Sequence, residues 1–203
     1  MCGHLAQHQE KINDDPKLFL VPILTLSFFS AMLVLQPDLG SAVVLLLSAL
    51  CLVFVAGMKL RYFFMLLMLF LLVLFFLIVL SSYRLERITG FLDPWEDRLD
   101  SGWQLTQALI AFGRGEWFGE GIGSGVQKLF YLPEAHNDFI LAVVAEELGI
   151  IGCWSILIIF GLFVVKIFGI ASRCFDQELN FAGLITYFIS CLFALQILSL
   201  IHI

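Results

Sequence analysis

Charge is scarce in this sequence. Only 14% of its 203 residues are Asp, Glu, Lys or Arg, whereas 61% are hydrophobic and 21 are Phe. The mean hydropathy of +0.98 excludes an ordinary soluble globular protein, because such proteins carry more charge and fewer apolar residues. The sequence also lacks a basic patch and its net charge is −6, so nucleic acid is not an expected partner.

Motifs of several common site classes are missing as well. No HExxH, paired CxxC or Walker sequence is present. The cysteines have no paired metal-ligand spacing, and three of them fall in apolar runs, where a thiol is usually a small apolar side chain. They are Cys2, Cys51, Cys153, Cys174 and Cys191.

Long apolar runs dominate instead. Those of about 18–20 residues can cross a bilayer, and we predict five transmembrane helices in one integral membrane domain over 1–203, an all-α polytopic bundle. The predicted spans are 18–35, 39–57, 62–80, 139–168 and 181–203. A polar segment leads straight into the first span, and the chain ends inside an apolar run. We therefore expect a part of a longer protein that is inactive by itself.

Basic residues in short loops give the predicted orientation. With the N-terminus inside, Lys59, Arg61, Lys166 and Arg173 are cytoplasmic, and the long segment 81–138 is a periplasmic loop.

That loop is too long for a simple connection and too rich in aromatic residues for disorder. Residues 101–112 have the pattern of an amphipathic interfacial helix. The glycine-rich stretch 113–125 permits positive φ and close backbone approach to another surface. It has no βαβ context, so a dinucleotide site is not expected.

Residues 133–139, PEAHNDF, crowd two carboxylates and an imidazole against the start of an apolar run. Ionisable groups at the edge of a hydrocarbon layer usually serve substrate, ion or proton chemistry. Asp138 begins a predicted span, so it is either an ordinary helix N-cap or a general base. Glu134 and His136 could tune Asp138 or bind substrate.

Three cations suit a diphosphate or another anionic head group. The alternative is interfacial placement with exchangeable ion pairs at the surface. They are Arg84, Arg87 and Lys128.

Several uncharged and acidic side chains are further candidates. Gln104 and Gln107 lie one helical turn apart and either bind sugar hydroxyls or cover a polar face, while Gln127 is another candidate for substrate binding. Glu146 and Glu147 are not both expected to face lipid. They either line a cavity, or one of them pairs with a base from another helix.

Four stretches together resemble a known family over roughly residues 7–196. They are QPDLG (36–40), YRLERITGFLDPWED (83–97), GWQLTQALIAFGRGEWFGEGIG (102–123) and VQKLFYLPEAHNDFILAVVAEELGIIG (126–152). They resemble the SEDS family of bacterial cell-wall glycosyltransferases, and the last two look like its division branch (FtsW) rather than its elongation branch (RodA). The sequence departs from the family's H-T-D motif at Asn137, where Thr is usual.

The resemblance implies a peptidoglycan glycosyltransferase that polymerises lipid II at the outer face of the inner membrane during cell division. It implies Asp138 as the general base that deprotonates a sugar 4-hydroxyl, with undecaprenyl diphosphate as the leaving group. The implied partners are a class B penicillin-binding protein transpeptidase, other membrane proteins of the divisome, and membrane lipid. No fixed cofactor is implied; a divalent cation such as Mg²⁺ could assist, although the sequence contains no evident ligand set.

Two other functions are compatible with such a membrane bundle. A transporter of the lipid-linked precursor should carry charges or broken helices at mid-bilayer, whereas the ionisable groups here cluster at the outer side. A non-catalytic scaffold of the divisome would not need the PEAHND segment.

Overall fold

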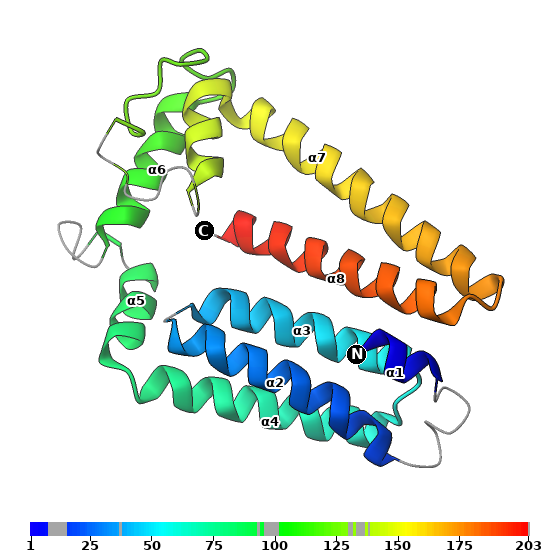
Figure 1. Cartoon of the computed structure of the whole chain (residues 1–203). Coiled ribbons are helices and arrows are strands. Elements are labelled where there is room, and N and C mark those ends of the chain that lie inside the picture. The colour runs from blue at the N-terminus through cyan, green and yellow to red at the C-terminus, as the bar shows by residue number, and fades with distance from the viewer. Residues whose placement is uncertain are drawn as a thin grey trace. The chain divides into compact units, whose positions relative to one another are not determined.

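The described part of the chain consists of helices and the turns between them. The computed structural model describes residues 1–7, 16–36, 38–92, 94–95, 102–129, 132, 137 and 139–202. The all-α class of a polytopic membrane protein is confirmed (Figure 1). The elements are α1 (Cys2–Gln7), the short 3-10 helix η1 (Pro16–Phe19), α2 (Leu20–Leu35), α3 (Leu39–Val55), α4 (Leu60–Val79), α5 (Ser82–Leu92), α6 (Trp103–Gly115), α7 (Ile140–Asp176) and α8 (Asn180–His202).

A helix lies on each of the five apolar runs. By length and composition, α4, α7 and α8 can cross a membrane, while α2 and α3 are shorter, at 16 and 17 residues. That all five cross stays a prediction. Helix α7 continues to Asp176, past the predicted end of the membrane span at 168.

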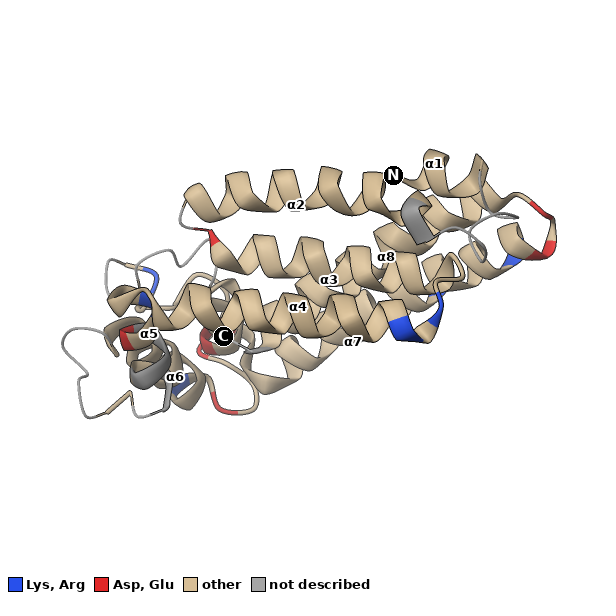
Figure 2. Ribbon diagram, turned by 90° about the horizontal axis from the view of Figure 1, so that it is seen from below, with Lys and Arg blue, Asp and Glu red and all other residues tan. Residues whose placement is uncertain are grey.

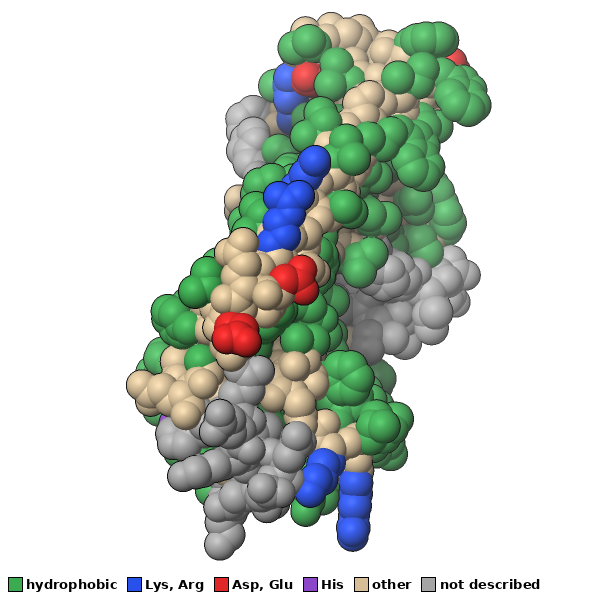
Figure 3. All heavy atoms as spheres, turned by 90° about the vertical axis from the view of Figure 1, so that its right-hand side faces the viewer, with side chains coloured by type: hydrophobic (Ala, Val, Ile, Leu, Met, Phe, Trp, Pro, Cys, Tyr) green, Lys and Arg blue, Asp and Glu red, His purple; other side chains and the backbone are tan. Residues whose placement is uncertain are grey.

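The long helices leave much apolar surface uncovered. The apolar window of α4 has no buried residue at all, and hydrophobic side chains cover much of the face in Figure 3. Helices α2 and α3 carry no charged residue, and Figure 2 shows the coloured charges mainly near helix ends and in turns. A helix that is apolar all round suits lipid or the interior of a large bundle.

The described residues form two compact units. The first comprises Met1–Leu71 and Gly161–Ser199, and the second Leu72–Phe160 and Leu200–Ile203. In the first unit α2 and α3 lie side by side (Figures 1 and 2). The buried core of this unit consists of Leu5, Phe19, Leu52, Val53, Ala56, Met58 and Leu184.

A side chain in the turn between α2 and α3 caps the second of these helices. The Oδ1 atom of Asp38 accepts a hydrogen bond from the backbone N–H of Ser41 at 3.0 Å. This contact satisfies one of the free N–H groups at the start of α3, so Asp38 is the N-cap of this helix.

The second unit contains the candidate residues of the long loop. Its buried residues include several alanines and glycines, and Gly115 in particular lets α6 approach the first turns of α7 closely. One cluster consists of Ala108, Ala111, Leu132, Phe139 and Ala142, and another of Leu141, Ala145 and Cys153.

Candidate active site

The residues on either side of the acidic segment are buried in one cluster. Asp138, Glu134 and His136 lie outside the described residues. Leu132, directly before the segment, and Phe139, directly after it, are 3% and 7% exposed and belong to the same buried cluster.

Helix α6 forms the other side of that cluster. Ala108 and Ala111 face Leu132, Phe139 and α7, with α6 beside the first turns of α7 in Figure 1. A helix lies where one was predicted at 101–112, although it spans Trp103–Gly115, and its position at a membrane interface stays a prediction. At its end a Cβ atom on Gly115 would lie 1.8 Å from the carbonyl oxygen of Ala145. Only glycine permits this approach.

Helix α7 is interrupted at Gly149, whose φ and ψ are 70° and −174°. This conformation is essentially restricted to glycine. In a continuous helix, Ile150 and Ile151 would donate to the carbonyls of Glu146 and Glu147. The break frees all four of these backbone groups.

The glycine-rich loop pairs each of the freed groups. Ile150 N–H donates to Glu116 O at 2.9 Å, and Ile151 N–H donates to Trp117 O at 3.3 Å. In return, Glu120 N–H donates to Glu146 O at 2.9 Å, and Gly121 N–H donates to Glu147 O at 3.1 Å. We call these four bonds the loop–helix interlock.

Glycines in the loop make the interlock possible. Gly119 has φ 79°, and a Cβ atom there would lie 2.2 Å from Glu147 O. Gly149 is equally confined, since its Cβ would lie 2.4 Å from the backbone of Trp117. The close backbone approach predicted for residues 113–125 is thus confirmed at Gly119.

The two adjacent acids of α7 have separate cationic partners. Glu146 is fully buried, and its Oε1 lies 3.4 Å from Nη1 of Arg114. Glu147 forms an ion pair with Lys128. Of the two alternatives, pairing is therefore the observed one, with one base on α6 and the other in the loop.

Backbone N–H groups also bind the Glu146 carboxylate. Val126 N–H donates to Oε1 at 3.0 Å, and Gln127 N–H donates to Oε2 at 3.1 Å. Arg114 reaches outward as well, with its Nε 3.2 Å from Oε1 of Glu120. The sequence analysis missed Arg114 and Glu120, and the only available signal was a single base within the glycine-rich run.

The predicted cations have different surroundings. Arg84 donates from Nη1 to the carbonyl oxygen of Leu77 at 2.7 Å, in the last turn of α4. Lys128 is occupied by Glu147, and the side chain of Arg87 lies outside the described residues. A role of these cations in anion binding stays a prediction.

The predicted glutamines are mostly covered. Gln107 and Gln127 are 8% and 6% exposed, and Gln104 is half-buried. The Oε1 atom of Gln127 has no hydrogen-bond partner in the described part of the chain. Within that part, no three His, Cys, Asp or Glu side chains come together to hold a metal ion.

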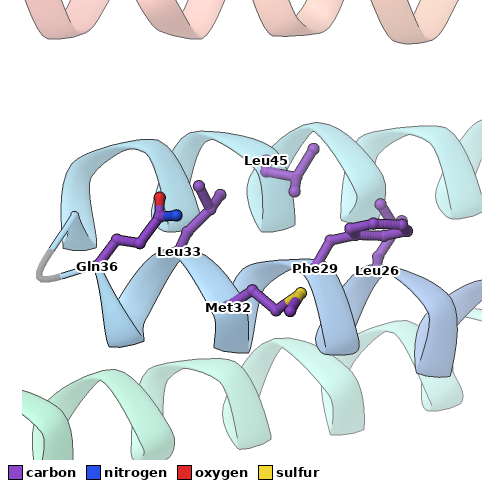
Figure 4. Close-up of a pocket in the computed structure, with 6 residues that line it drawn as sticks. All are labelled: Leu26, Phe29, Met32, Leu33, Gln36 and Leu45. Carbon is purple, nitrogen blue, oxygen red and sulfur yellow. The ribbon is translucent and has the colours of Figure 1, made fainter.

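An apolar pocket of about 360 Å³ lies in the first unit, between α2 and α3 (Figure 4). Gln36 is the one polar residue in its lining, and none of the predicted site residues contributes to it. The lining consists of Leu26, Phe29, Met32, Leu33, Gln36 and Leu45.

The family model described as "Cell cycle protein", FtsW/RodA/SpoVE, matches residues 1–203. The chain belongs to this family. The resemblance seen in the sequence is thereby confirmed. Apolar helices and FtsW/RodA/SpoVE membership together indicate a multi-pass protein of the bacterial inner membrane.

Curated relatives in the FtsW/RodA/SpoVE family bear the name "Probable peptidoglycan glycosyltransferase FtsW". The one from Legionella pneumophila is 43% identical over 196 residues, which cover 97% of this chain and 50% of the relative. The relative from Coxiella burnetii is 44% identical over 198 residues, covering 98% of this chain and 53% of the relative. The chain thus spans about half the length of the curated relatives it matches.

The interlock predicts that a methyl group added at Gly149 strongly lowers the stability of the protein. Gly149→Ala should destabilise this FtsW/RodA/SpoVE member by more than about 2 kcal/mol, since the backbone strain alone is worth about 1–3 kcal/mol and the Cβ meets Trp117. Gly161→Ala is the matched control in the same helix, because its Cβ meets nothing within 4 Å. The free energy of unfolding of both variants would be measured in mixed micelles. Equal values for Gly149→Ala and Gly161→Ala would contradict the interlock.

Proposed function

We propose that the complete protein containing this chain is a peptidoglycan glycosyltransferase that polymerises lipid II during cell division. The observation that carries the proposal is the match of nearly the whole chain to relatives named probable peptidoglycan glycosyltransferase FtsW. The acidic segment supports it, because glycosyl transfer from a diphosphate-linked sugar needs a base for the acceptor hydroxyl.

In the proposed reaction Asp138 is the general base. It removes the proton of the sugar 4-hydroxyl on one lipid-linked disaccharide as that oxygen attacks the anomeric carbon of the growing strand. The bond from this carbon to undecaprenyl diphosphate breaks, and the diphosphate leaves with the electron pair. Leu132 and Phe139, which lie on either side of this base in sequence, belong to one buried cluster.

Cations would stabilise the charge that develops on the leaving diphosphate. Arg84, Arg87 and Lys128 are the proposed groups, and Glu134 and His136 would bind substrate or tune the base. For Lys128 this role requires exchange of its present partner, Glu147, for the diphosphate. Gln104, Gln107 and Gln127 are proposed to hydrogen-bond the sugars.

The proposed site faces the periplasm, with residues 81–138 outside and Lys59 and Arg173 in the cytoplasm. The proposed partners are a class B penicillin-binding protein transpeptidase and other divisome membrane proteins at the septum. The transpeptidase would cross-link the strands that this protein polymerises.

The base is tested by Asp138→Asn in the complete protein, purified with its transpeptidase and supplied with labelled lipid II. Loss of a general base typically costs about 10²–10⁴ in rate, so we expect almost no polymer. Glycan chains formed at the rate of the unaltered protein would rule out this role.

The cations are tested by changing Arg84, Arg87 and Lys128 singly to Gln. A binding role predicts slower lipid II turnover at normal membrane abundance. Loss of abundance without loss of turnover per molecule would instead identify structural ion pairs. Arg84→Gln also removes the hydrogen bond to Leu77 O, so for this variant turnover has to be expressed per molecule present in the membrane.

Orientation is tested with single cysteines at Asp100 and Lys59 in an otherwise cysteine-free protein. A membrane-impermeant maleimide added to intact spheroplasts should modify the cysteine at position 100 and spare the one at 59. The reverse pattern would invert the proposed topology.

A further inference from the structure

The carboxylate of Glu146 is a buried anion held by the segment that leads to the acidic motif. Its side chain has no exposed surface, and it accepts hydrogen bonds from two successive backbone N–H groups, those of Val126 and Gln127. Arg114 supplies the countercharge. A buried carboxylate is costly unless it is paired and hydrogen-bonded, and here both conditions are met.

The loop is shaped around this carboxylate. A Cβ atom on Gly125 would lie 2.9 Å from Oε2 of Glu146, so the glycine lets the backbone approach closely enough for the next two N–H groups to donate. Backbone amides of this kind, turned toward one anion, form a concave anion site. In this protein the anion is the protein's own side chain.

A continuous hydrogen-bonded path leads from Glu146 to the acidic segment. The carboxylate binds the N–H of Gln127, and the carbonyl oxygen of Gln127 accepts from the N–H of Leu132 at 2.9 Å. Leu132 is buried in the cluster that also contains Phe139. The residue after Leu132 is Pro133, the first of the segment that contains Asp138.

We infer that Glu146, with Arg114, is a positioning residue for the Asp138 segment. It fixes the backbone at 126–127 and, through the hydrogen bond from Leu132 to Gln127, it fixes the residue that directly precedes 133–138 in sequence. This inference rests on the proposed function. A misplacement of about 1 Å at a reacting group can cost about 10²-fold in rate, so the effect should fall on the chemical step rather than on binding of the lipid.

The test uses Glu146→Gln in the complete protein with its transpeptidase. Gln keeps the size and one acceptor oxygen but removes the charge that Arg114 and the two N–H groups bind. We expect kcat for lipid II polymerisation to fall at least about tenfold with KM little changed. Hydrogen exchange at the amides of Val126 and Gln127 should become faster in the same variant, a readout independent of activity.

Glu120→Gln is the matched control, because Glu120 shares Arg114 but lies on the surface and binds neither amide. It should leave kcat and amide exchange unchanged. Gly125→Ala tests the contact from the loop side while keeping the buried carboxylate, and it should reproduce the loss of kcat. It decides the question if Glu146→Gln fails to accumulate in the membrane.

The inference would be overturned if Glu146→Gln kept the wild-type kcat, or if amide exchange at residues 126–127 were unchanged. If Glu146→Gln does not accumulate, a wild-type kcat in Gly125→Ala would overturn it in the same way. Weaker KM with normal kcat would also overturn it, since that pattern belongs to substrate binding. Absence of polymerisation in the unaltered protein would count against the proposed function instead. The exchange result would then decide by itself whether Glu146 holds the segment.

Discussion

A helix that is broken among apolar residues must find partners for the backbone groups that the break releases. In α7 the break at Gly149 releases two carbonyls and two N–H groups, and the loop after α6 pairs all four. Each such group left unpaired away from water would cost several kcal/mol. The loop therefore cannot leave the helix without a large loss of stability, and the rest of the candidate site is built on this attachment.

The ion pairs determine which residues of α6 and the loop lie opposite which residues of α7. Glu146 and Glu147 are neighbours in sequence, yet Glu146 pairs with Arg114 at the end of α6 and Glu147 with Lys128 in the loop. Because a buried ion pair adds little net stability over apolar packing, its value here is in specifying which loop residues face which turn of α7. Backbone and side-chain contacts thus define the same alignment of the loop on the helix.

Periodicity and composition predicted the helices, because apolar runs and short polar turns are local signals. The family was predicted from the resemblance of four sequence stretches and not from periodicity. The break at Gly149 was not predicted, since an isolated glycine in an apolar run is usually tolerated within a helix. Arg114 was missed for a related reason: its partner Glu146 is distant in sequence, and no local pattern links a base in a glycine-rich run to an acid in an apolar helix. The placement of Asp138 stays a prediction, because that residue lies outside the described part of the chain.

The interlock limits which sequence changes residues 116–121 can accept. Its four hydrogen bonds involve only backbone atoms, so the side chains of Glu116, Trp117 and Glu120 are not what holds the loop. Substitution at these positions leaves the pairing intact wherever the backbone conformation is kept. Insertion or deletion of one residue between 116 and 121 would instead shift donors against acceptors and leave groups of α7 unpaired. The length of this short stretch should therefore be far less variable than the side chains at positions 116, 117 and 120, whereas an ordinary surface loop tolerates insertions and deletions.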